Sequence, residues 1–155
     1  MKLQDFDFRI WDKTKEEFLK KEPTLIKLDN ERVIAGRISR FYANTADIAD
    51  MFIGNGNDLE IELWTGYFDK NGNKIYENDI IKNESLEEIY YITRDNTYKM
   101  FKIIIYDKDC NENLYRKKNP ADINLLKMLV SDKNMSVIGN IHENEEILKN
   151  TELLK

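Results

Sequence analysis

Hydrophobic and polar residues alternate along most of this chain, and this period of two predicts a mostly β protein. In residues 6–11, Phe6, Phe8 and Ile10 point one way and polar residues lie between them. Residues 59–68 alternate in the same manner. Further strands are predicted at 32–42, 88–93, 98–106 and 135–141.

Other segments carry a helical pattern or an ambiguous one. The apolar residues of 44–53 recur at i, i+3 and i+4, which predicts a short helix. Residues 120–130 predict a second helix, with Asn119 as its cap and Pro120 in its first turn. Residues 14–28 fit either a helical turn or the loop of a hairpin that returns through residues 24–28.

The stretch from Leu63 to Lys82 contains a tight hairpin. Asn71-Gly72 is a strong hairpin signal and predicts a type I′ turn, which needs positive φ at both residues. Asp69 can accept backbone N–H bonds at the turn entrance. Gly66 lies inside a predicted strand, where glycine usually marks a bulge or a close backbone approach.

A second tight turn follows at Glu77-Asn78-Asp79. Asn78 is expected in the left-handed region, which asparagine tolerates better than β-branched residues do. A long hairpin, a one-residue corner and a new strand are how small barrels turn a corner. The residues of this stretch therefore have a structural explanation that needs no catalytic role.

Three segments together resemble the YopX family of phage and prophage proteins. The first is Phe8-Arg9-Ile10-Trp11-Asp12 near the start. The last runs from Val137 to Leu148 and includes Gly139-Asn140. The central segment contributes Trp64, Gly66, Asp69, Asn71, Gly72, Tyr76 and Asp79. Asn78, His142 and Glu145 depart from the usual glycine, tyrosine and proline of the family pattern.

The resemblance spans the whole chain and implies a mostly β protein with an SH3-like small barrel. We expect one YopX-like domain over 1–155. Its N-terminal strand and variable segment occupy 1–58, and its barrel with a short C-terminal helix occupies 59–155. The resemblance also implies a phage or prophage origin. It implies no established activity.

Composition limits the classes of function. The chain has 155 residues, a net charge of −5 and one cysteine, Cys110, in the polar segment 107–119. A lone cysteine fits a reducing cytoplasm, and we expect a cytoplasmic protein of the bacterial host cell. No apolar run reaches the roughly 20 residues of a membrane span. The negative charge disfavours a nonspecific nucleic-acid binder.

Candidate catalytic or metal-binding residues are few. His142 is the only histidine and is followed by glutamates, but an acidic segment of this kind is typical of a solvated surface. The pairs Asp107/Asp109 and Glu60/Glu62 could contribute to a hard-metal site, although neither pair has a third ligand at a set spacing. We therefore expect no enzyme activity, no cofactor and no metal.

Aromatic residues are dense around the hairpin and suit either a barrel core or a binding surface. Their exposed members could bind a protein or stack nucleic-acid bases beside Arg94, Lys99 or Lys102. The residues expected to contact a partner are Trp64, Tyr67, Tyr91 and Arg94. The leading hypothesis is a non-enzymatic module that binds an unknown host or phage protein, with homo-oligomerisation possible. The alternative is a nucleic-acid-binding barrel.

Overall fold

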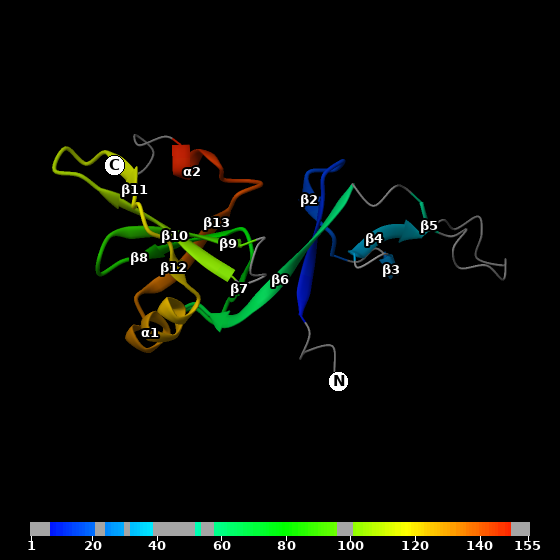
Figure 1. The fold of residues 1–155 in the computed structure, drawn as a ribbon, viewed down its shortest axis with the longest axis horizontal. Helices are drawn as coiled ribbons and strands as arrows, with labels where there is room; N and C mark the ends of the chain where they lie inside the picture. The colour runs from blue at the N-terminus through cyan, green and yellow to red at the C-terminus, as the bar shows by residue number, and fades with distance from the viewer. Residues whose placement is uncertain are drawn as a thin grey trace. The chain divides into compact units, whose positions relative to one another are not determined.

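The computed structural model describes residues 7–20, 24–29, 32–38, 52–53, 58–95 and 101–149. By its internal contacts the chain divides into two compact units, Met1–Leu63 and Trp64–Lys155. The fold is mostly β with two short helices in the described ranges (Figure 1), which confirms the fold class predicted from the alternation.

The first unit is built from short antiparallel strands. They are β1 (Phe8–Asp12), β2 (Glu17–Phe18), β3 (Thr24–Asp29), β4 (Arg32–Ile38), β5 (Phe52–Ile53) and the first half of β6 (Leu59–Phe68). The ambiguous segment 14–28 contains β2, which pairs with β1 through Trp11 and Phe18, and then β3. A hairpin does follow β1, but it returns through Glu17 and Phe18 and not through residues 24–28, which form β3 and pair with β4. Ile10, Ala35 and Leu59 form the core of this unit.

The prediction of a helix over 44–53 is wrong for residues 52–53, the part of this range that the structure describes. Phe52 and Ile53 form β5, which pairs with Ile38 and Arg37 of β4. A Phe-Ile pair has a high strand propensity, and pairing to a neighbouring strand overrides the helical spacing. The remainder of that predicted helix lies outside the described residues, as does the start of the strand predicted at 98–106.

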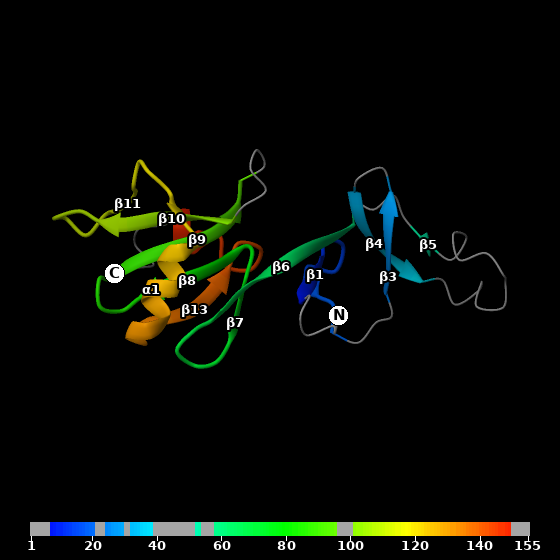
Figure 2. The same cartoon turned by 60° about the horizontal axis from the view of Figure 1, so that its bottom comes forward.

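The second unit holds one curled sheet and both helices. Its strands after β6 are β7 (Lys74–Tyr76), β8 (Asp79–Asn83), β9 (Glu88–Arg94), β10 (Phe101–Lys108), β11 (Leu114–Arg116), β12 (Ala121–Asp122) and β13 (Met135–Asn140). The helices are α1 (Asn124–Asp132) and α2 (Glu146–Lys149). The sheet order is β11-β10-β9-β8-β13, with β12 also on β10. Its curl makes a half-barrel, and α1 lies over the sheet in Figure 2.

One hydrophobic core fills this half-barrel between the sheet and α1. Its buried members are Ile75, Ile81, Tyr90, Ile92, Ile103, Leu126, Leu129 and Met135. Ile104 is buried as well, although it alternates with Ile103 and therefore points to the opposite face of the sheet. Ile103 and Ile104 of β10 are thus buried on opposite faces of the sheet.

Helix α1 begins later than its sequence predicts. Asn119 and Pro120 were expected at its start, but Ala121 pairs with Ile103 and forms β12. The helix then begins at Asn124, whose backbone N–H donates to Oδ1 of Asp122 at 2.7 Å. At Ala121 and Asp122, pairing with β10 therefore replaces the helical conformation that the local sequence favours. Within the residues that the structure describes, no helix is long and apolar enough to span a membrane.

Candidate binding surface

The central hairpin between β6 and β7 forms where it was predicted, but its turn type differs. The N–H of Gly72 donates to the carbonyl of Asp69 at 3.1 Å, and only Gly72, at φ +82°, has a positive φ in the Asn71-Gly72 pair. The loop is a type I turn followed by a left-handed glycine, which makes a bulge. The type I′ prediction is therefore wrong, because one left-handed residue suffices in a three-residue loop.

Asp69 holds this turn together and also ties it to the end of the sheet. Its Oδ1 accepts the N–H groups of Asn71 and Asn73 at 2.9 and 2.8 Å, and its Oδ2 accepts the Nδ2 of Asn73 and the N–H of Val137 in β13. Burial alone would raise the pKa of this carboxyl, but the hydrogen bonds together hold the pKa below its usual value. The sequence prediction for Asp69 is confirmed.

The hairpin between β10 and β11 repeats this turn. The N–H groups of Asn111 and Asn113 donate to Oδ1 of Asp109 at 2.9 and 2.8 Å. Glu112, at φ 63°, takes the left-handed position that Gly72 has in the first turn. The repeat D-x-N-x-N marks both turns in the sequence, so the polar segment 107–119 contains an ordered hairpin.

Gly66 and Asn78 have the backbone conformations that their sequence context predicts. Gly66 has φ +91° at the point where the pairing of β6 with β7 shifts register, so it forms the expected bulge. Asn78 has φ 70°. Its N–H donates to Ile92 and its carbonyl accepts the N–H of Ile141, at 2.8 and 2.9 Å. The corner thus joins β9 to the segment after β13.

The side chains of the corner residues are also used inside the fold. Oδ2 of Asp79 accepts the N–H of Tyr76 at 2.8 Å. Oδ1 of Asn78 accepts the hydroxyl of Tyr91 at 3.0 Å. Asp79 and Asn78 are both buried. These residues therefore hold the corner, which is the structural role expected for them.

The segment that follows β13 forms another turn held by a polar side chain. Oδ1 of Asn140 accepts the N–H groups of His142 and Glu143, each at 3.0 Å, and its Nδ2 donates to Glu143 at 2.9 Å. A Cβ added to Gly139 would lie 2.8 Å from the Cβ of Asn144 and would also meet that residue's Oδ1. Position 139 therefore requires glycine, because a larger residue would clash with the side chain of Asn144.

Two of the carboxylates considered as metal ligands, Glu62 and Asp107, have basic neighbours. Glu62 is fully buried and accepts the Nε of Arg9 at 2.7 Å. Asp107 lies 3.4 Å from the ammonium of Lys117, which also pairs with Glu88. The pairing with Glu88 raises the pKa of Lys117. Both carboxylates are thus accounted for by ion pairs within their own units.

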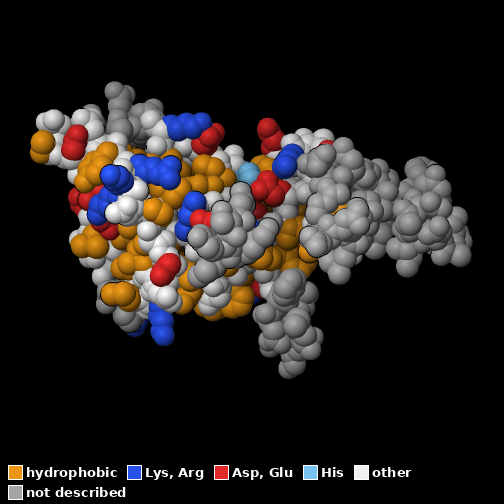
Figure 3. All heavy atoms as spheres, in the orientation of Figure 1, with side chains coloured by type: hydrophobic (Ala, Val, Ile, Leu, Met, Phe, Trp, Pro, Cys, Tyr) orange, Lys and Arg blue, Asp and Glu red, His pale blue; other side chains and the backbone are white. Residues whose placement is uncertain are grey.

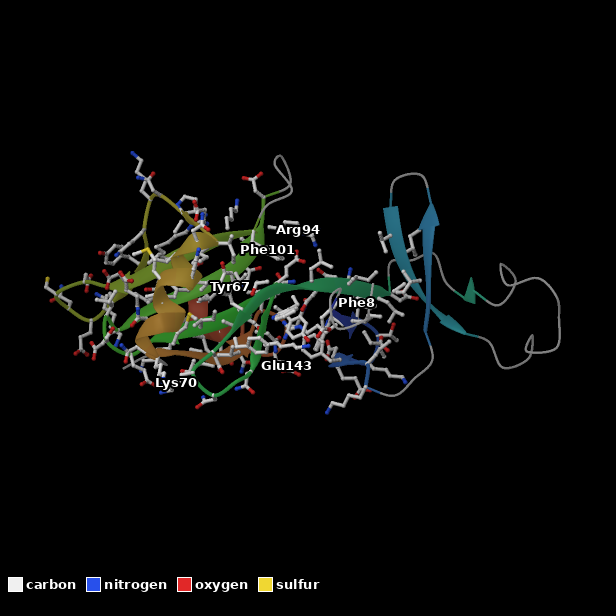
Figure 4. The ribbon with its side chains drawn as sticks, turned by 90° about the horizontal axis from the view of Figure 1, so that it is seen from below. Phe8, Tyr67, Lys70, Arg94, Phe101 and Glu143 are labelled. Carbon is white, nitrogen blue, oxygen red and sulfur yellow. The ribbon has the colours of Figure 1, made fainter. Side chains whose placement is uncertain are left out.

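The four residues expected to contact a partner do not form one surface. Tyr67 packs against the hydrophobic core, and Tyr91 bonds to Asn78. Arg94 pairs with Glu77 through Nη2 at 2.6 Å and lies opposite Phe101 (Figure 4). Trp64 alone belongs to an outward-facing aromatic group.

That aromatic group lies on the face of the β6–β7 hairpin opposite Ile75. Trp64 pairs with Tyr76 and Phe68 pairs with Lys74, so all four side chains share one face. The rings of Trp64 and Phe68 meet edge to face with centroids 5.3 Å apart, and the Lys74 ammonium lies 4.9 Å from the Trp64 centroid. Phe68 is 42% exposed. We call Trp64, Phe68, Lys74 and Tyr76 the hairpin face.

Sequence reasoning did not select Phe68 or Lys74 as contact residues. Strict alternation places Phe68 and Trp64 on one face and Tyr67 on the other, and the pairing across the bulge at Gly66 keeps this arrangement. The cross-strand partner Lys74 follows from the register that the three-residue loop gives to β6 and β7. Both residues could have been found by pairing the two strands across the turn.

The fold and the hairpin define a class of small β protein with a curled sheet and an ordered D-x-N-G-N turn. The family model described as YopX protein matches residues 7–149. The chain therefore belongs to the YopX family, as its motifs indicated.

A search of the curated proteins finds no match. Among solved structures, the chain is similar to protein EF1440 from Enterococcus faecalis, known from a crystal structure. The identity is 19%, the match covers 92% of this chain and 97% of that chain, and the TM-score is 0.44. The family assignment rests on the family model.

Proposed function

We propose that this chain is a phage-encoded accessory protein that acts in the cytoplasm of the bacterial host by binding a protein partner. It catalyses no reaction of its own in this proposal. The observation that carries it is the hairpin face, where a half-exposed phenylalanine lies beside a tryptophan. Tryptophan and tyrosine are enriched among the residues that dominate binding energy at protein interfaces.

The use of the family motif inside the fold supports this proposal. Asp69, Asn78, Asp79 and Asn140 are buried and bonded to backbone or side-chain groups. These polar residues are therefore explained by the turns that they hold. The side chains available to contact a partner are therefore exposed ones beside these turns, such as Phe68.

The charge of the surface favours a protein over nucleic acid as the partner. The chain carries 29 acidic and 24 basic residues, and Figure 3 shows basic, acidic and hydrophobic side chains interspersed on the visible face of the second unit. Arg94, which could have contacted phosphates, is paired with Glu77. Nonspecific nucleic-acid binding needs a basic face that releases counterions.

The test is capture of partners from host lysate by the tagged full chain, with and without nuclease. The variant Phe68→Ser removes the exposed ring of the hairpin face. Its matched control is Leu86→Ser, which changes a 59% exposed residue in the loop between β8 and β9. Circular dichroism of each variant checks that it keeps the fold of the parent chain, because Phe68→Ser also removes the edge-to-face contact with Trp64, which is worth about 0.5–1.5 kcal/mol.

We expect a protein that survives nuclease treatment, is retained by Leu86→Ser and is lost with Phe68→Ser. A signal that disappears with nuclease would favour nucleic acid instead. Equal capture by both variants would place the interaction elsewhere on the chain and would contradict the role of the hairpin face.

A further inference from the structure

The strand β11 ends the sheet of the second unit and leaves one strand edge open. Within the described residues β11 pairs only with β10, and Figure 2 shows it at the outer end of the sheet. We propose that an acidic strand of a partner protein pairs with this open edge. The inference concerns a second surface, separate from the hairpin face, and it goes beyond the proposed function.

The backbone groups of β11 supply hydrogen bonds to an added strand. The N–H of Lys117 donates to the carbonyl of Ile105 at 2.8 Å. Antiparallel pairs alternate between hydrogen-bonded and non-hydrogen-bonded ones, so Tyr115 directs its backbone groups to β10, whereas Leu114 and Arg116 direct theirs to the open edge. In the part of the chain that the structure describes, these groups of Leu114 and Arg116 have no other partner. Each residue offers one donor and one acceptor, as strand addition requires.

The two faces of the β10–β11 hairpin carry different charges. Arg116 lies opposite Tyr106 and shares a face with Lys108, and this face is opposite to the core that Ile105 contacts. Among the described residues, neither of these two cationic side chains has an ion-pair partner. Asp107 points to the other face, where a lysine ammonium compensates its charge. An added strand therefore meets uncompensated positive charge on one face only.

This arrangement specifies the side chains of the added strand. The residue opposite Arg116 should be Asp or Glu, because cross-strand pairs of opposite charge stabilise a sheet and like charges destabilise it. The next residue lies opposite Tyr115, whose side chain is 46% exposed on the other face, so an apolar residue is favoured there. The preferred partner strand therefore alternates acidic and apolar residues.

The same features disfavour two other occupants of the edge. Two copies of β11 that paired with each other would bring the Arg116 and Lys108 side chains of both copies onto one face, where like charges repel. A nucleic acid could neutralise these cations, but its sugar-phosphate backbone has no N–H donors for the carbonyl groups of the edge. An acidic protein strand satisfies both the charges and the backbone.

The test is selection of short random peptides on the immobilised full chain, with counter-selection on Arg116→Glu, which reverses the charge beside the open edge. The matched control is Lys127→Glu, which makes the same change in net charge at an exposed residue of α1. Phe68→Ser is included because its change lies on the hairpin face. The selected peptide is also made with methylated backbone nitrogens, which cannot donate hydrogen bonds.

We expect the selected peptides to alternate acidic and apolar residues. Arg116→Glu should bind them on the order of tenfold more weakly, whereas Lys127→Glu and Phe68→Ser should bind them as the parent chain does. Methylation of the backbone nitrogens should abolish binding. Bound peptide should also raise the hydrogen-exchange protection of the Leu114 and Arg116 amides.

Several results would overturn the inference. They are a failure to enrich peptides over Arg116→Glu, peptides without acidic bias, equal binding of the methylated peptide, and loss of the peptide with Phe68→Ser. Self-association of the parent chain that Arg116→Glu abolishes would overturn it in favour of a second copy. A single-stranded oligonucleotide that binds more tightly than the peptide and requires Arg116 would overturn it in favour of nucleic acid. The lysate capture tests the hairpin face separately, so either proposal can fail while the other stands.

Discussion

Replacing Asp69 with alanine should destabilise the second unit through one identifiable set of hydrogen bonds. The carboxylate accepts N–H groups from Asn71, Asn73 and Val137. The donors of Asn71 and Asn73 lie in an exposed loop where water can replace the carboxylate. The N–H of Val137 lies in β13, under the hairpin, and an N–H left without an acceptor there costs about 1–3 kcal/mol.

Together with the loss of the local turn bonds, at about 1 kcal/mol, the expected destabilisation by Asp69→Ala is about 2–4 kcal/mol. Asp109→Ala is the matched control, because Asp109 holds the same turn through Asn111 and Asn113 but is exposed. It should cause a clearly smaller loss. The difference between the two variants isolates the bond to β13 and the burial of Asp69.

Urea unfolding followed by circular dichroism gives the two losses, and amide hydrogen exchange gives a local measure. The exchange protection of the Val137 amide should fall in Asp69→Ala and stay unchanged in Asp109→Ala. Equal destabilisation by the two variants would refute the reasoning. Unchanged protection at Val137 in Asp69→Ala would refute it as well, because the hydrogen bond between Val137 and Asp69 would then contribute nothing to stability.

Three further predictions follow from the turns. Glu112→Gly should stabilise the chain by about 0.5–1 kcal/mol in urea unfolding, since glycine takes the left-handed position without a Cβ penalty; a loss of stability would contradict this. Gly139→Ala should destabilise by roughly 1–3 kcal/mol, and a double-mutant cycle with Asn144→Ala should show that the two losses are less than additive. Because hydrogen bonds lower the pKa of Asp69 in the folded state, its contribution to stability is present above the ordinary carboxyl value of 3.8 and is lost as the pH falls through the folded pKa. A pH series of unfolding curves should therefore show a shallower acid limb for Asp69→Asn than for the parent chain.

The sequence predicts most strands because strong local signals and tertiary pairing agree in them. Alternation places β1, β6 and β13 correctly. The left-handed conformation of Asn78 and the bulge at Gly66 follow from residue type and context. In these places the backbone conformation depends on the residue itself.

The errors arise where distant pairing decides between two local options. Ala121 joins the edge of β10, and Phe52 joins β4, so both leave the helices predicted for them. The turn type at Asn71 depends on whether the loop has two or three residues. That length is set by the register of β6 with β7, which the local sequence leaves open.

The candidate binding residues are the part of the site that sequence predicts least well. Aromatic density indicates the hairpin but does not separate Tyr67, which packs inward, from Phe68, which faces water. Arg94 looks available in the sequence, yet Glu77, 17 residues away, neutralises it. Assigning a side chain to the core or the surface requires the pairing of the whole sheet.

The central claim is that the buried turn residues hold the fold while the hairpin face carries the binding. Its most direct test is partner capture under nuclease by Phe68→Ser and Asp69→Ala at a temperature where circular dichroism shows both variants to be folded. We predict that Asp69→Ala, although less stable to urea, captures the partner and that Phe68→Ser, although folded, does not. Retained capture by Phe68→Ser together with loss by folded Asp69→Ala would contradict the claim, because the turn itself would then be the contact surface.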